Sequence, residues 1–281
     1  MTMQQDLLFA FGIGYVAEAL GRDLLKQGWC VAGTVRSEGK AKQLTAAGFD
    51  VQIFDGSGGL AVPDGAHWLI SIPPGATGCP AYLAASNQAA AAKTVTYLST
   101  TGVYGDRQGQ WVYEWSHVAP SSERARRRAF AELQWMSLGQ KHAIVRLPGI
   151  YGPSRSPLDR VRSGTAKRII KPGQVFSRVH VDDIASGLKA RFERPETGGI
   201  FHLCDDEPAP PQDVIEHAAS LLSAPVPSAE DFETADLSEM ARSFYSECKR
   251  VANGRAKAAL SWRPAYPTYR DGLAAILAAG G

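Results

Sequence analysis

A glycine-rich turn near the N-terminus carries the residue types best suited to a specific chemistry. It follows a short apolar segment and consists of Gly12, Ile13, Gly14, Tyr15, Val16 and Ala17. Gly12 permits a tight turn, Gly14 lets a phosphate approach the backbone, and Ala17 lets a helix pack closely on a strand. Unpaired N–H groups at the start of that helix favour an anionic pyrophosphate. The turn predicts a dinucleotide site; the alternative is a turn of the same shape that binds nothing.

Two charged residues follow the next apolar segments and bear on which dinucleotide is bound. NAD sites usually have an acidic residue about 20 residues beyond the glycines, where it bonds the ribose 2′-hydroxyl. This sequence has Arg36 there, and a guanidinium can hold a 2′-phosphate. NADP is therefore the favoured cofactor, with NAD as the alternative, and an exposed arginine without a ligand is the simpler interpretation. Asp55 either meets the adenine edge or forms a turn with Gly56.

Strand and helix patterns alternate along the chain, so the elements that position these residues are those of a parallel sheet covered on both faces. Strands are expected over 7–11, 30–35, 51–54, 67–72, 94–98, 142–147 and 199–203. Helices are expected over 15–27, 40–47, 82–93, 122–138 and 183–193. The predicted fold is α/β, a Rossmann-type doubly wound parallel sheet with a smaller C-terminal α+β lobe. The sheet domain is assigned to 1–152 plus about 177–205, and a substrate-capping lobe to 153–176 and 206–281.

Composition excludes several classes of protein. The 281 residues carry a formal net charge of +2, which is too small for a nucleic-acid footprint. No apolar run approaches the ~20 residues of a membrane span, and the first residues lack the pattern of a signal peptide. The four cysteines are far apart and the histidines lack metal-ligand spacing, so we expect free thiols, no metal and a cytoplasmic location. The expected partner is a small-molecule substrate, and monomer and homodimer both stay open.

Six segments together resemble the NAD-dependent epimerase/dehydratase family, the extended and atypical short-chain dehydrogenase/reductases. They are FGIGYVAEAL, GTVR, LISIPP, LSTTGVYGD, RLPGIYGP and SRVHVDD, and they span nearly the whole chain. The loop G-x-G-Y is most similar to that of the atypical subgroup. The resemblance implies NAD(P) binding, and it implies that five further residues line the ribose and nicotinamide: Ser71, Ile72, Pro73, Pro148 and Ile150.

The resemblance also implies residues on the substrate side. Thr100 matches the family's catalytic Ser/Thr, while Ser177, Arg178 and His180 match a stretch that faces substrate or closes the cleft. Arg155 adds a further candidate contact for an anion or a sugar. Strand ends are where such sheets bind ligands, although ordinary loop residues occur there as well.

One helix departs from the family pattern. Where the family has Tyr-x-x-x-Lys, this sequence has Arg124 and Arg128. Arginine stays protonated and is a poor proton donor, although Arg128 could hydrogen-bond the ribose hydroxyls. The alternative for this basic run is a solvated helix face. Tyr104, on the same loop as Thr100, is the nearest substitute phenol, or else a packing aromatic.

Two functions remain after this departure. The first is an NADP-preferring oxidoreductase or epimerase-like enzyme that acts on a small polar or sugar-like substrate with a non-standard proton donor. The second is a non-catalytic NADP(H)-binding sensor. An enzyme predicts a polar pocket beside the nicotinamide, built partly by the C-terminal lobe, whereas a sensor predicts a filled or apolar one.

Overall fold

A seven-stranded parallel sheet forms the centre of the structure, a computed structural model that describes residues 5–139 and 141–280. From one edge to the other the strands lie in the order β3-β2-β1-β4-β5-β7-β11. They are β1 (Leu7–Phe11), β2 (Cys30–Val35), β3 (Asp50–Ile53), β4 (His67–Ile70), β5 (Thr94–Thr100), β7 (Ala143–Leu147) and β11 (Gly199–His202). The strand order reverses between β1 and β4, where open α/β sheets bind ligands. The predicted Rossmann-type fold is confirmed.

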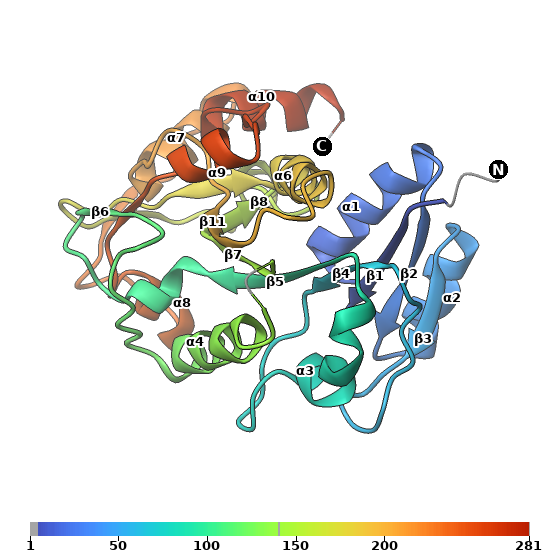
Figure 1. Ribbon diagram of the computed structural model, residues 1–281. Helices are drawn as coiled ribbons and strands as arrows, with labels where there is room; N and C mark the ends of the chain where they lie inside the picture. Colours follow the sequence, from blue (N-terminus) through green and yellow to red (C-terminus); the bar gives the residue numbers. More distant parts are fainter. Residues whose placement is uncertain (1–4, 140, 281) are drawn as a thin grey trace.

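Helices cover both faces of this sheet (Figure 1). One face carries α1 (Tyr15–Lys26), α2 (Glu38–Ala46) and α6 (Val181–Phe192), whose apolar side chains share one core with the sheet. The other face carries α3 (Pro80–Ala85) and α4 (Glu123–Met136), which close a second core around Trp68 and Trp135. These two cores hold the sheet between the helices, and the carboxyl ends of its parallel strands form the edge where such sheets bind ligands.

The chain after β7 builds a smaller α+β region beside that edge. Its elements are β8 (Gly149–Tyr151), α5 (Pro157–Arg162), β9 (Arg168–Ile170), β10 (Arg178–His180), α7 (Pro211–Leu221), β12 (Ala229–Asp231), α8 (Glu239–Phe244) and α10 (Tyr269–Ala278). β8 pairs with β10 and β9 with β12, both in parallel. A third core joins α5, α7 and α10. By contrast, α9 (Gly254–Ala259) packs into the core of the sheet, and the predicted domain boundaries stay a prediction.

A late strand returns to the first half of the chain. β13 (Arg250–Val251) pairs in parallel with β6 (Trp111–Val112), just after the 3₁₀ helix η2 (Thr101–Tyr104). Nearby, His202 Nδ1 lies 2.8 Å from the carbonyl oxygen of Ala252. The C-terminal part of the chain is therefore built into the sheet region as well as standing beside it.

The Ala-rich stretch expected as one helix over 82–93 divides in two. It forms α3 and then the 3₁₀ helix η1 (Ser86–Ala91). The Gln88 side chain explains the change, because it donates to the carbonyl of Leu60 and accepts from the N–H of Val62. Within the described ranges, no helix combines the length and the apolarity needed to cross a bilayer.

Candidate functional site

The glycine loop is tied to the second strand by backbone bonds. The Gly12 N–H donates to Thr34 Oγ1 at 2.9 Å, and the Ile13 N–H donates to the Thr34 carbonyl at 2.7 Å. Gly12 has a φ of +86°, and a Cβ there would lie 2.8 Å from Ile72 Cγ1. Only glycine fits this position, since the left-handed backbone and the close Ile72 both exclude a side chain.

Gly14 faces open space at the start of α1. It is the N-cap residue, no side chain caps the helix there, and a Cβ would meet no protein atom within 4 Å. Ala17 is fully buried behind it, which lets α1 lie close to the sheet. The space in front of Gly14 and the first N–H groups of α1 form an open cradle that a side chain at position 14 would fill. Free N–H groups at a helix start suit a phosphate, so the residues present fit a dinucleotide.

Arg36 and Asp55 follow the next two strands, and their surroundings differ. Arg36 is exposed and has no acidic partner within 4 Å in the described part of the chain, whereas nearby Lys40 pairs with Glu18 at 2.6 Å. Asp55 accepts from the Ser57 N–H at 2.9 Å, and this turn lowers the pKa of its carboxyl. The turn interpretation of Asp55 thus has a visible basis, while its adenine contact stays a prediction.

The strand ends expected to meet the nicotinamide lie along one edge. The N–H groups of Ser71 and Ile72 both donate to the carbonyl of Phe11, which holds the chain leading to Pro73 against the glycine loop. Thr100 Oγ1 accepts from the Gly102 N–H at 3.1 Å, so its own proton stays free to donate. Pro148 follows β7 and lines the same cavity as Thr100.

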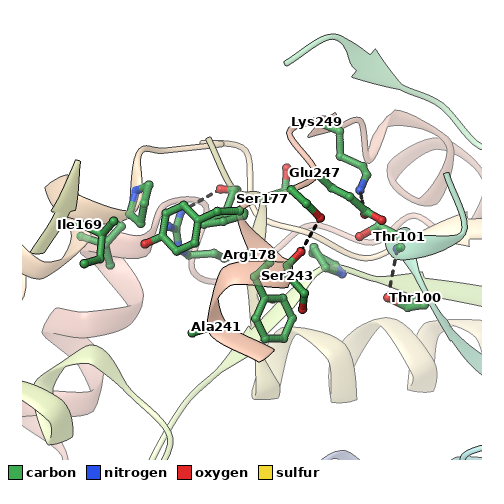
Figure 2. Close-up of a pocket in the computed structure, with 18 of the residues that line it drawn as sticks. Thr100, Thr101, Ile169, Ser177, Arg178, Ala241, Ser243, Glu247 and Lys249 are labelled. Atoms are coloured by element: carbon green, nitrogen blue, oxygen red, sulfur yellow. Dashed lines mark hydrogen bonds and ion pairs between the residues drawn. The ribbon is translucent and has the colours of Figure 1, made fainter. Parts of the chain in front are cut away.

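That cavity, of about 650 Å³, lies between the sheet edge and the smaller lobe. Figure 2 shows Thr100 and Thr101 on one side of it and Ile169 on the other, with Ser177 and Arg178 between them. Its size matches ordinary small-molecule sites. The cavity lies where a substrate pocket was expected, and charged and apolar side chains line it together.

Most of the charged side chains that line the large cavity are cationic. Five lining side chains are cationic: Arg124, Arg160, Lys167, Arg178 and Lys249. Within the described ranges, Glu247 is the one lining carboxylate, and Lys249 pairs with it at 2.5 Å. The cavity is therefore an electropositive site.

A second cavity of about 470 Å³ lies next to the first, and the two share Arg160 and Arg178. Ile150 and Arg155 line it, and the Arg155 guanidinium lies 5.6 Å from the centre of the Tyr15 ring. The Tyr15 hydroxyl donates to the Pro153 carbonyl at 2.9 Å. Tyr15 and Arg155 thus join the glycine-loop helix to the lobe.

Tyr104 does not face this site, so the expectation that it shares the cleft with Thr100 is wrong. The η2 turn directs its ring inward, where it is fully buried. Its hydroxyl lies 2.6 Å from His202 Nε2 and accepts from Arg146 at 2.7 Å, and burial raises its pKa to about 12. This phenol is a structural hydrogen-bonding group with no path to a substrate.

Two residues expected near the substrate have structural bonds instead. Ser177 lines the large cavity, but its hydroxyl accepts from the Val251 N–H at 3.0 Å. His180 is 2% exposed, and its Nδ1 accepts from the Asp182 N–H at the start of α6. Burial lowers the His180 pKa, so the imidazole is neutral at pH 7. The structure gives His180 the role of a helix cap, in place of the expected substrate contact.

The arginines at the start of α4 have different surroundings. Arg124 lines the cavity and stacks over Phe244 of α8, with 5.6 Å between guanidinium and ring centre. Arg126 and Arg127 pair with Glu123 on the solvated face. Arg128 donates from Nη1 to the Leu98 carbonyl at 2.7 Å and stacks on the Tyr97 ring. Arg128 thus ties α4 to β5, and its ribose contact stays a prediction.

A buried ion pair supports the strand ends from behind. Arg146 on β7 and Glu132 on α4 pair at 2.6 Å, with both side chains almost fully buried. Ser99, directly before Thr100, donates to the same carboxylate. Because Pro148 follows Arg146 by two residues, this cluster sets the spacing of the two strand ends that line the cavity.

Sequence reasoning missed Arg160, Lys167 and Lys249 as lining residues. Arg160 could have been suspected, since it follows the RLPGIYGP segment within a short basic helix. Lys249 offered no local signal, because only the pairing of β13 with β6 brings it to the cavity.

Comparisons with known proteins agree with this architecture. No protein-family model matches the sequence. A functionally unknown conserved protein from Silicibacter pomeroyi is 46% identical, covers 98% of this chain and 99% of its own, and superposes with a TM-score of 0.90. A Streptomyces protein named 3-diazoavenalumate denitrifying reductase is 33% identical over 158 residues, and the match spans 52% of this chain and 51% of that protein.

More distant solved structures share the fold and carry nicotinamide cofactors. The human epimerase family protein SDR39U1 with NADPH has a TM-score of 0.76 at 15% identity, covering 97% of this chain and 99% of that one. A UDP-glucuronic acid 4-epimerase from Bacillus cereus in complex with NAD has a TM-score of 0.75 at 17% identity, covering 97% and 95%. The predicted likeness to the NAD-dependent epimerase/dehydratase fold is confirmed.

Proposed function

We propose that this chain, which belongs to one family with the conserved Silicibacter pomeroyi protein, is an NADP(H)-dependent oxidoreductase with the fold of the NAD-dependent epimerases and dehydratases. One observation carries the proposal: the open cradle at Gly14 and the large cavity at Thr100 lie along the same edge of the sheet, at the ends of β1 and β5, with β4 between them. Arg36 supports NADP over NAD, since it is exposed after β2 without an acidic partner in the described residues.

The residues that line the cavity would bind and polarise the substrate carbonyl that accepts the hydride. The Thr100 hydroxyl, whose lone pair already accepts from Gly102, donates its proton to a substrate oxygen. Arg124, in the position of the family's tyrosine, stays protonated and stabilises negative charge that develops there. A bound reduced nicotinamide would supply the hydride. Water in the open cavity would deliver the proton, since the one phenol expected nearby, Tyr104, is buried.

Reduction is favoured over epimerisation by this arrangement. An epimerase must remove and return a proton at the same carbon-bound hydroxyl, which calls for a phenol or another base of suitable pKa. Arg124 cannot serve as that base. The Streptomyces relative, named a reductase, supports the same choice. The isolated cysteines agree with a cytoplasmic location for such an enzyme.

The cofactor half of the proposal is tested with Gly14→Val. Because the added side chain meets no protein atom, the variant should fold normally and yet lose NADPH binding by occupying the phosphate cradle. Gly254→Val is the matched control, since Gly254 also has no atom within 4 Å of its added Cβ and lies at the start of α9. Unchanged NADPH affinity in a folded Gly14→Val protein, measured by calorimetry, would contradict the proposal.

The catalytic half is tested by following NADPH absorbance over a panel of ketones and aldehydes assayed with NADPH, secondary alcohols assayed with NADP⁺, and sugar nucleotides assayed with each. Turnover on ordinary secondary alcohols and sugar nucleotides should be weak, because the loss of a positioned acid typically lowers a rate by about 10² to 10⁴. Arg124→Ala should reduce the remaining activity without changing NADPH affinity. NADPH binding with no turnover on any member of the panel would instead favour the sensor.

A further inference from the structure

We infer that the substrate of this cavity is an organic anion with an apolar body, whose charged group is bound by Arg160, Arg178 and the Tyr245 hydroxyl. This inference rests on the proposed function, because it assigns the substrate class of the same site. In Figure 2, Arg178 lies between Ile169 and the strand end that bears Thr100. An anion held there would leave the rest of the molecule free to reach Thr100.

The balance of charge in the cavity is the first support. Five cationic side chains line it, although the whole chain carries a net charge of only +2. Glu247 is already neutralised by Lys249 at 2.5 Å. The remaining excess of positive charge, in a cleft with low-dielectric walls, attracts anions and rejects cations.

Arg160 gives the second support. Its side chain is accessible to solvent from both cavities, and it has no acidic partner within 4 Å among residues 5–139 and 141–280. The surrounding protein still displaces enough water to lower its pKa. A guanidinium kept partly desolvated without a counter-ion is stabilised when an anion binds, and planar bidentate geometry suits carboxylates and phosphates alike.

Arg178 is in a similar state for a different reason. It donates from Nη1 to the carbonyls of Phe176 and Ala209, which fix its direction but leave its charge uncompensated. Asp205, whose N–H donates to the Arg178 carbonyl at 2.8 Å, is 2% exposed, and neither of its carboxylate oxygens has a hydrogen-bond partner among the described residues. Burial raises the pKa of Asp205 to about 8, so it stays protonated at neutral pH and does not neutralise Arg178.

Tyr245 completes the subsite and begins its apolar part. Tyr245 lines the same cavity as Arg160 and Arg178. Burial raises the Tyr245 pKa, so the hydroxyl keeps its proton and can donate it to an anion. The Tyr245 ring packs edge-on against Phe176 at 5.5 Å, and Ile169 and Val214 extend the same wall. An aromatic carboxylate or an aryl phosphate fits this combination.

Calorimetry with three probes that share a phenyl ring and differ in their polar group tests the inference. The probes are 3-phenylpropanoate, phenyl phosphate and the neutral 3-phenylpropanamide. Each is titrated into protein saturated with NADP⁺ and into protein without it. At least one anion should bind, and the amide should bind about tenfold more weakly or not at all. The two anions tell a carboxylate site from a phosphate site by their relative affinity.

Substitutions of single residues test where the anion binds. Arg160→Gln should weaken the anion about ten- to a hundred-fold, as expected for a lost charge-assisted hydrogen bond, and Tyr245→Phe should weaken it less. Arg162→Gln, on the same helix and exposed, is the matched control and should bind like the wild type. A retained thermal midpoint in each variant shows that the fold is intact.

The outcomes separate the two proposals. If NADP⁺ does not bind but an anion binds in an Arg160-dependent way, the proposed function fails and the anion subsite stands. If NADP⁺ binds, three results overturn the inference: no anion binds at millimolar concentration, the amide binds as tightly as the anions, or Arg162→Gln loses as much affinity as Arg160→Gln.

Discussion

The glycine loop and the large cavity lie along the same edge of the central sheet, but their residues are gathered in opposite ways. The loop is local: Gly12 and Ile13 bond to Thr34, all within one β–α–β unit. The cavity draws Thr100 from β5, Arg160 from α5 and Lys249 from beside β13. The proposed cofactor site is therefore formed by one short segment, whereas the proposed substrate site depends on the completed fold.

The ion pair of Glu132 and Arg146 supports the cavity region, because it sets the spacing of the strand ends that bear Thr100 and Pro148. Glu132→Gln leaves Arg146 buried without a counter-charge, so the free energy of unfolding should fall by about 3–5 kcal/mol in urea titrations. Glu123→Gln on the exposed face of α4 is the control and should lower it much less, because water screens its ion pairs. Equal losses in the two variants would mean that the buried pair does not stabilise these strand ends.

Arg36→Ala should affect the cofactor region alone. Loss of a charge-assisted bond to the 2′-phosphate should weaken NADP binding by roughly 1.5–3 kcal/mol, or about ten- to a hundred-fold, and leave NAD affinity unchanged. Lys42→Ala, on the exposed face of the following helix, should change neither affinity. Wild-type protein that binds both cofactors equally in calorimetry would remove the basis for the NADP preference.

Asp205 gives the cavity region a pH dependence that the loop lacks. Burial raises its folded pKa from the ordinary 3.8 to about 8, so the folded state holds a proton that the unfolded state releases. Its contribution is thus favourable at low pH and is lost as pH rises from about 4 to about 8, by at most about 1.4 kcal/mol per pH unit. Asp205→Asn should remove this slope from pH-dependent unfolding curves, whereas Asp64→Asn on the surface should retain it.

Tyr104→Phe should have the smallest effect. The hydroxyl bonds to His202, Arg146 and the Tyr113 carbonyl, so its loss should lower the free energy of unfolding by about 1 kcal/mol. The pH profile of NADPH oxidation should stay the same, because the phenol has no contact with the cavity. A profile that loses its acidic limb in Tyr104→Phe would show that proton transfer reaches the network, against the geometry described.

The contrast between local and long-range contacts also explains which parts of the fold and of the site the sequence predicts. β1 and β2 are predicted with their observed bounds, because both flank the loop and their signals are local. The helix expected over 82–93 is only partly right, since Gln88 bonds to a distant loop at Leu60. Tyr104 was misplaced because a 3₁₀ turn, invisible in a pattern of residue types, directs the ring inward. Arg160 and Lys249 converge only through tertiary pairing.

The pairing of β13 with β6 also bears on how the chain is made. His202, on an edge strand of the sheet, has its ring nitrogen against the carbonyl of Ala252, and Val251 lies beside Val112. On a ribosome, the first two hundred residues can assemble the cofactor cradle, because its contacts are sequentially close. The substrate side has to wait until residues near 252 emerge. During synthesis the nascent chain can thus form the proposed cofactor cradle before the cavity beside it is complete.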